Sequence, residues 1–153
     1  MAKVKFTPIQ HYKMDKKTNE YKLDKNGCKI AIDLYKGTTF EEMIDFLKEF
    51  SLTIAPKLDS EPEISIKYMD DATAKVSTAL AYYMKSPLDS TSSEEITLND
   101  HLLGLNATDT LLTMGHEGYP GHLYAYCFSK QLDISNIAKA MTSTSHAEGW
   151  AKY

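Results

Sequence analysis

The chain has 153 residues, 42% of them hydrophobic and 25% charged, which is the balance of one ordinary globular domain. Its net charge is -4 and all 17 basic residues are lysines, so no arginine is available to clamp a carboxylate or a phosphate. We expect no nucleic-acid partner, no membrane-spanning segment and no signal peptide, because basic stripes, long apolar runs and an apolar N-terminal core are all missing.

Residues 1–38 are predicted to form an N-terminal segment that contains a β-hairpin. Residues 25–27, Lys-Asn-Gly, are turn formers between two stretches rich in β-branched and aromatic residues, within "NEYKLDKNGCKIAIDLYKG". The lysine-rich "KMDKKTNE" before them is typical of a solvated loop. Cys28 and Cys127 lie far apart and form no CxxC pair, so both are predicted to be packing residues.

A helix is predicted over residues 37–52, "GTTFEEMIDFLKEFSL". Thr39 precedes Glu42 by three positions, which is the pattern of a capping box. Apolar residues recur behind it at helical spacing, namely Phe40, Met43, Ile44, Leu47 and Phe50.

Two strands are predicted in the middle of the chain. Residues 63–70, "EISIKYMD", alternate so that Ile64, Ile66 and Tyr68 share one face. Residues 94–100, "EEITLND", alternate in the same way. We expect this second strand to offer an edge to which an extended substrate can add.

Helices dominate the second half of the chain. "NATDTLLTMGHEG" is predicted to be a helix capped near Asn106 or Thr108, and "GHLYAYCFSKQL" continues in helical character. The segment "SNIAKAMTSTSHAEGWAKY" is read as a further helix, with no glycine cap or proline stop after it, so we expect a piece of a longer protein. The predicted fold class is therefore α+β and mainly helical, with a small β element of hairpin and edge strands before the helices.

"MGHEGYPGHLYAY", residues 114–126, places His116 and Glu117 six and five positions before a second histidine, His122. In HExxH zinc sites the two histidines are four residues apart and share one helix face. Six apart in a regular helix, they would point roughly 120° apart and lie about 9 Å apart along the axis. Pro120 is incompatible with a regular helix at this point, and the neighbouring glycines allow unusual backbone angles.

We therefore predict a bulge of two extra residues that brings His116 and His122 to one side. The alternative is that the glycines and the proline simply end one helix and leave the histidines on the surface.

A catalytic zinc site needs a third protein ligand. His146 and Glu148 are the candidates, and on a helix they would point about 200° apart, so at most one can face the metal. We choose Glu148, because two histidines with a carboxylate form a recognised zinc-hydrolase set and Gly149 would permit close approach of another element.

The sequence HEGYPGH followed by EGWAKY resembles the bacterial "domain of unknown function 885" family, which is predicted to consist of zincin-like metallopeptidases. The resemblance runs from near Thr39 to Tyr153, which divides the chain into an N-terminal segment, 1–38, and a partial zincin-like core, 39–153. It implies His116, His122 and Glu148 as zinc ligands and Glu117 as general base. Many members carry a histidine where this chain has Leu123, which leaves the ligand set intact. Members are also several times longer.

These observations predict zinc-dependent hydrolysis of a peptide substrate, with Glu117 taking a proton from water. Tyr83, or its neighbour Tyr82, could donate a hydrogen bond to the oxyanion. Since the clamping groups of longer members are absent here, we expect this chain alone to be a weak or inactive enzyme. The alternatives are a metal-binding fragment without turnover and a metal-free interaction module.

Overall fold

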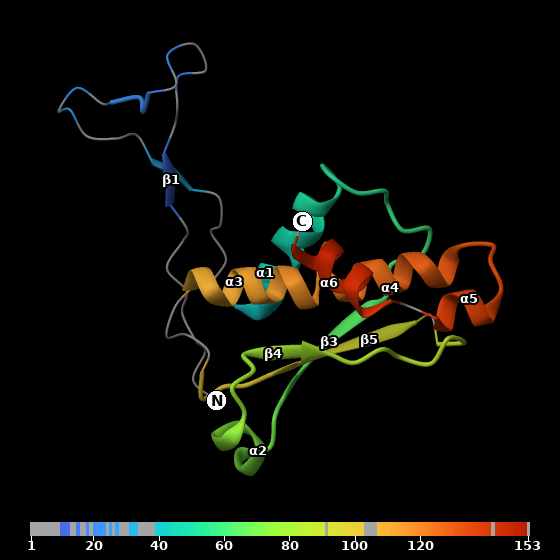
Figure 1. The fold of residues 1–153 in the computed structure, drawn as a ribbon. Helices are drawn as coiled ribbons and strands as arrows, with labels where there is room; N and C mark the ends of the chain where they lie inside the picture. The colour runs from blue at the N-terminus through green and yellow to red at the C-terminus, as the bar shows by residue number, and fades with distance from the viewer. Residues whose placement is uncertain are drawn as a thin grey trace.

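The computed structural model describes residues 10–12, 15, 18, 20–23, 25, 27, 31–33, 39–90, 92–102, 107–141 and 143–152. Within these residues the fold is α+β and mainly helical, as the sequence predicts (Figure 1). Its parts are a two-stranded sheet near the N-terminus, a three-stranded sheet and a set of helices.

The predicted hairpin around residues 25–27 lies partly outside the described residues. Within them, strand β1 (Gln10–Tyr12) pairs antiparallel with β2 (Ala31–Asp33). Gly27 has a φ of 77°, which is the left-handed region that a turn glycine can adopt. Cys28 and Asn26 lie outside the described residues.

Helix α1 (Phe40–Ser51) confirms the predicted capping box. The Thr39 hydroxyl accepts from the Glu42 N–H at 3.2 Å, and the Glu42 carboxylate accepts from the Thr39 N–H at 3.1 Å. Phe50 lies in the last turn of the helix, as its spacing predicts, but it is 48% exposed and stacks on Phe46. The buried residues of α1 are Phe40, Met43, Ile44, Leu47 and Ser51.

The three-stranded sheet has the order β3-β5-β4. Strand β3 (Glu63–Tyr68) runs parallel to β5 (Ser93–Leu98), and β4 (Ala81–Tyr83) runs antiparallel to it. Both strands predicted in the middle of the chain are present. However, β5 is the central strand with both edges paired, so the expectation that a substrate adds to it was wrong.

Four helices follow the sheet: α3 (Ala107–Glu117), α4 (His122–Gln131), α5 (Asn136–Ala140) and α6 (Thr144–Lys152). The last predicted helix is thus two helices, and the Ser135 hydroxyl caps the first of them through the Ala138 N–H. A further short helix, α2 (Asp71–Val76), which was not predicted, begins after Asp70, whose side chain accepts from the Thr73 N–H.

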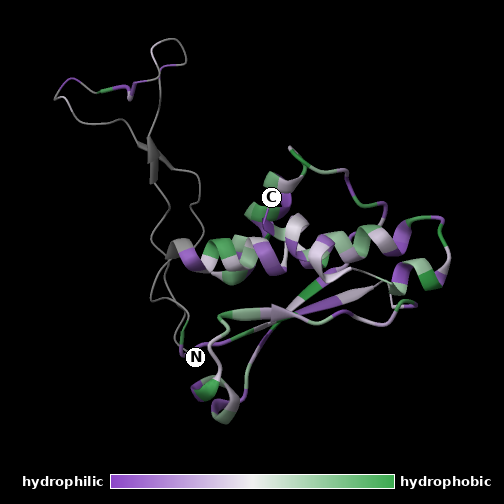
Figure 2. Ribbon diagram, in the orientation of Figure 1, coloured by the Kyte–Doolittle hydropathy of each residue, from purple (hydrophilic) through white to green (hydrophobic). Residues whose placement is uncertain are grey.

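The core lies between the sheet and the helices α1, α3 and α4 (Figure 1). Hydrophilic and hydrophobic residues alternate along α3 and α4, as expected of helices with one packed face (Figure 2). Cys127 is 3% exposed and unpaired, which confirms its predicted packing role. No helix in the described part of the chain is long and apolar enough to cross a membrane. The buried core comprises Phe40, Met43, Ile44, Leu47, Leu58, Ala81, Ile96, Leu98, Met114, Tyr119, Leu123, Tyr124 and Cys127.

Candidate metal centre

The candidate site lies at the break between α3 and α4. Helix α3 ends at Glu117 and α4 begins at His122, with Pro120 in the connection. Proline lacks an N–H, and in a continuous helix its ring would clash with the carbonyl of His116, four residues back. The prediction that the backbone leaves the α-helix here is confirmed.

Backbone hydrogen bonds across the break show how the helical course is regained. The Gly121 N–H donates to the Gly115 carbonyl at 3.0 Å, and the Tyr124 N–H donates to the Gly118 carbonyl at 3.1 Å. Each bond spans six residues, whereas an α-helical bond spans four. The connection therefore accommodates two extra residues, which is the bulge predicted from the spacing.

Two glycines are required by this tight connection. A Cβ atom on Gly121 would lie 1.8 Å from the His116 carbonyl oxygen, and one on Gly118 would lie 2.7 Å from the Met114 carbonyl oxygen. Contacts this short are incompatible with any side chain, so the two chain segments can approach only because glycine occupies both positions.

The bulge brings three predicted site residues together. The ring centroids of His116 and His122 are 4.5 Å apart. Glu148, on α6, lies against both rings: its Oε2 is 3.3 Å from the His116 Nε2, and its Oε1 is 3.4 Å from the His122 Nε2. The predicted convergence is therefore present in the structure.

The two Nε2-to-carboxylate separations can be compared with those around a shared metal ion and with those of direct hydrogen bonds. Ligand atoms about 2.0–2.2 Å from a tetrahedral zinc lie about 3.3–3.6 Å from one another. A charge-assisted hydrogen bond between an imidazole and a carboxylate would be shorter, about 2.7–2.9 Å. The side chains of His116, His122 and Glu148 are 24%, 18% and 47% exposed, so water can reach the cluster.

Glu117 is a fourth member of the cluster. One ligand atom each from His116, Glu117 and His122 lie within 4.8 Å of one another, so Glu117 competes with Glu148 for a place beside a metal. Two observations separate them. The Glu148 oxygens lie 3.3 and 3.4 Å from the two Nε2 atoms, and the Glu117 Oε2 already accepts from the Tyr83 N–H of β4 at 2.9 Å.

The side chain of Tyr83 is directed elsewhere, which corrects its predicted role as an oxyanion donor. Its hydroxyl donates to the Glu94 Oε2 at 2.7 Å. Burial, reinforced by this hydrogen bond to a carboxylate, raises the pKa of Tyr83 above its ordinary value. The contribution of Tyr83 to the cluster is its backbone N–H. Tyr82, the other candidate, is 37% exposed.

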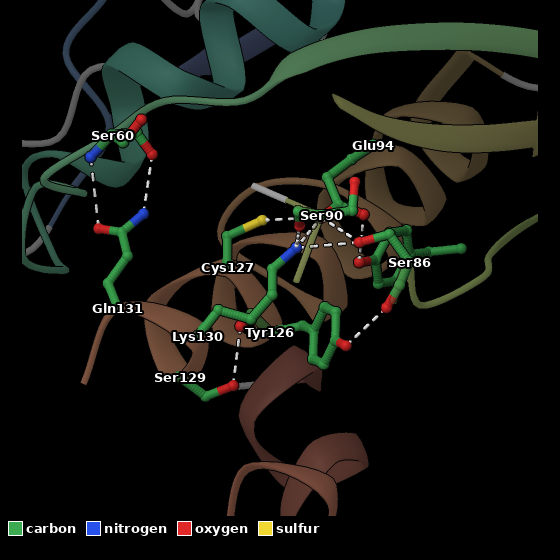
Figure 3. A network of polar contacts seen from close by, with 10 residues as sticks. Ser60, Ser86, Ser90, Glu94, Tyr126, Cys127, Ser129, Lys130 and Gln131 are labelled. Atoms are coloured by element: carbon green, nitrogen blue, oxygen red, sulfur yellow. Dashed lines mark hydrogen bonds and ion pairs between the residues drawn. The ribbon is translucent and has the colours of Figure 1, made fainter. Parts of the chain in front are cut away.

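A buried polar network, which no local sequence pattern predicts, connects α4 to the sheet beside the site. Lys130 of α4 contacts the Glu94 Oε1 of β5, with side chains only 4% and 0% exposed (Figure 3). Ser86 joins them, donating to the Glu94 Oε1 at 2.8 Å, and the Lys130 Nζ donates to the Ser90 carbonyl at 2.6 Å. These contacts fix α4, the helix that His122 opens, to the central strand.

The charges in this network are balanced. Burial by itself would raise the pKa of Glu94, but hydrogen bonds from Lys130, Tyr83 and Ser86 outweigh it and hold that pKa below its ordinary value. Burial raises the pKa of the nearby Cys127 thiol to about 12, so this cysteine is a neutral packing group.

Trp150 holds α6 against the bulge, a role that the sequence analysis did not predict. Its indole N–H donates to the Pro120 carbonyl at 2.7 Å, and its ring stacks on Tyr124 with centroids 6.3 Å apart. Because Trp150 follows Glu148 by two residues on α6, this contact also sets the position of Glu148. Gly149 does not have its predicted role, since a Cβ there would meet nothing within 4 Å.

Fold and site together define an α+β domain with a His-His-Glu cluster at a bulged helix junction. Residues 14–153 match the family described as "Bacterial protein of unknown function (DUF885)", and the chain belongs to this family. This match begins at residue 14, earlier in the chain than Thr39, the residue near which the resemblance seen in the motifs begins.

One solved structure shares the fold. It is described as the "putative lipoprotein from Colwellia psychrerythraea", with a TM-score of 0.52 and 16% identity, over 76% of this chain and 25% of that one. This chain thus spans about a quarter of that protein's length. No curated protein matches the chain.

Proposed function

We propose that this chain carries the metal site of a zinc-dependent hydrolase that cleaves peptide bonds. The observation that carries the proposal is the position of Glu148, whose two oxygens lie 3.3 and 3.4 Å from the Nε2 atoms of His116 and His122. Two imidazoles and a carboxylate form a recognised donor set of zinc hydrolases. The choice of a peptide substrate rests on the resemblance of HEGYPGH and EGWAKY to predicted metallopeptidases.

In this proposal His116, His122 and Glu148 hold the ion. Zinc bound there would supply a Lewis acid that polarises a carbonyl group and makes water more acidic. Glu117 is the general base, which accepts a proton from the attacking water and can return it to the leaving nitrogen.

The Tyr83 N–H orients Glu117 for this task. It binds one carboxylate oxygen, Oε2, at 2.9 Å and so fixes the plane of the group while the other oxygen can take the proton. Successive residues on a helix point about 100° apart, so the His116 imidazole and the Glu117 carboxylate can take the separate roles of ligand and base.

A metal site without turnover is the second candidate, and the structure offers one specific observation in its favour. The Tyr83 hydroxyl is bound to Glu94, so the phenol predicted to stabilise the oxyanion is directed away from the cluster. This candidate and the hydrolase share the same ligands and differ only in whether peptides are cleaved.

Zinc titration of the metal-free chain by calorimetry, followed by an assay on a mixed peptide library, tests the proposal. We expect one zinc per chain and slow cleavage that a chelator abolishes, since the chain alone is expected to be a weak enzyme. His122→Ala should lower zinc affinity by at least about tenfold, within the range seen when ligand geometry is disturbed. His146→Ala is the matched control, since His146 is exposed and was the competing candidate. Zinc binding without cleavage would favour the second candidate.

A further inference from the structure

A cavity of about 570 Å³ opens beside the candidate centre, between α4 and α6. Most of its wall is aromatic or aliphatic, with Tyr126, Phe128, Leu132 and Trp150 among the lining residues. Its volume is in the range of small-molecule sites, about 300–1,000 Å³. It is large enough to receive a bulky side chain together with part of its backbone.

The cavity and the candidate centre share residues. His122 and Glu148 line the cavity and also belong to the cluster. A group that fills the cavity therefore lies next to the proposed metal, and the bond attached to that group is within reach of the site. An apolar cavity remote from the cluster would have no such relation to a scissile bond.

We infer that this cavity binds a large apolar side chain, preferably aromatic, of the peptide whose bond is cleaved. The inference rests on the proposed function for the identity of the occupant. Aromatic rings on the wall favour an aromatic guest, because ring pairs gain energy beyond the area they bury. A phenylalanine side chain should bind at least about tenfold more tightly than an alanine side chain there.

The charged side chain of Lys85 would favour a different occupant, an acidic side chain. It lines the cavity, and its Nζ lies 5.4 Å from the centroid of the Tyr126 ring. If this ammonium dominated, an acidic side chain would be preferred. We expect it not to dominate, because Lys85 is exposed and its charge is screened by solvent.

The single tryptophan of the chain provides the readout. Since Trp150 lines the cavity, its fluorescence reports occupancy without interference from another indole. The metal-free chain in chelator would be titrated with three blocked tripeptides, N-acetyl-Ala-Xaa-Ala-amide, in which Xaa is Phe, Ala or Glu. We expect a saturable change of emission with the Phe peptide and at least about tenfold weaker binding of the other two.

Variants at the wall locate the binding. Ala147→Phe places a ring in the cavity and should weaken binding of the Phe peptide at least about tenfold, whereas Ser145→Phe, at an exposed position of α6 outside the wall, should leave it unchanged. Should Ala147→Phe fail to fold, Leu132→Ala serves instead. Leu132 is 39% exposed, so its truncation should leave the fold intact and weaken binding several-fold.

Equal affinity for the three peptides, tighter binding of the Glu peptide, or equal effects of Ala147→Phe and Ser145→Phe would each overturn the inference. These titrations contain no metal and involve no turnover, so they are independent of the zinc and cleavage assays. Peptide binding without zinc binding would contradict the proposed function. Zinc binding without binding of the Phe peptide would contradict only the assignment of this cavity.

Discussion

His116 and His122 are six positions apart in the sequence, yet their ring centroids are 4.5 Å apart and both Nε2 atoms face the Glu148 carboxylate. In a regular helix six residues would separate them by about 9 Å along the axis. The bulge that contains Pro120 removes this separation, so the metal proposal depends on the conformation of the four residues, 118–121, between the two helices.

The first prediction concerns Gly121 in that bulge. Gly121→Ala should destabilise the fold by more than about 2 kcal/mol, because its Cβ would lie 1.8 Å from the His116 carbonyl oxygen. Gly149→Ala is the control: a Cβ there meets nothing within 4 Å, and alanine within α6 should stabilise by about 0.5–1 kcal/mol. Urea unfolding measures both, and similar values for the two variants would contradict the description of the bulge.

The second prediction uses two adjacent glutamates of β5, each paired with a lysine. Glu94 and Lys130 are buried, so Glu94→Gln leaves an uncompensated ammonium in the interior and should cost about 3–5 kcal/mol. Glu95 and Lys67 are 46% and 66% exposed and 3.6 Å apart, so Glu95→Gln should change stability by less than about 1 kcal/mol. Chemical denaturation gives both numbers, and equal effects would refute the assigned role of the buried pair.

The third prediction is a pH dependence. The folded-state pKa of Glu94 lies below its ordinary value of 4.5, so the unfolded chain binds this proton more readily than the folded chain. Its contribution is present in full above that ordinary value and is lost as the pH falls through the folded-state pKa. The free energy of unfolding should therefore decline in this acidic range, and Glu94→Gln should make the decline shallower. An unchanged acid slope in the variant would show that other carboxylates dominate.

The fourth prediction separates metal binding from chemistry. Glu117→Gln keeps an oxygen that can accept from the Tyr83 N–H but removes the base. Zinc affinity of this chain should stay within about threefold, while turnover by the longer parent protein, in which the base is limiting, should fall by about 10²–10⁴, the usual contribution of a general base. The rate of peptide cleavage by the zinc-loaded protein measures this, and loss of zinc with loss of turnover would place Glu117 among the ligands.

Local patterns predicted much of the fold. The capping box at Thr39 and the alternation at Ile64, Ile66 and Tyr68 were sufficient to identify α1 and β3, because both depend on near neighbours. Sheet order depends on distant pairing, which alternation does not encode. The strand at 94–100 was therefore recognised as a strand but misplaced at an edge.

The candidate site likewise has features that follow from local sequence and features that depend on distant contacts. Pro120 and the glycines predicted the bulge because their effects on the backbone are intrinsic. The environments of Tyr83 and Lys130 depend on which residues surround them in three dimensions. Glu94 lies 36 positions from Lys130 in the chain, and no local pattern marks the two as partners.

X-ray absorption at the zinc edge, combined with anomalous diffraction from zinc-loaded crystals, tests the central claim most directly. The account predicts a single zinc ion with the Nε2 atoms of His116 and His122 and an oxygen of Glu148 at about 2.0–2.2 Å. An anomalous map without a peak at this cluster, with Glu148 drawn into hydrogen bonds of about 2.7–2.9 Å to the imidazoles, would contradict it.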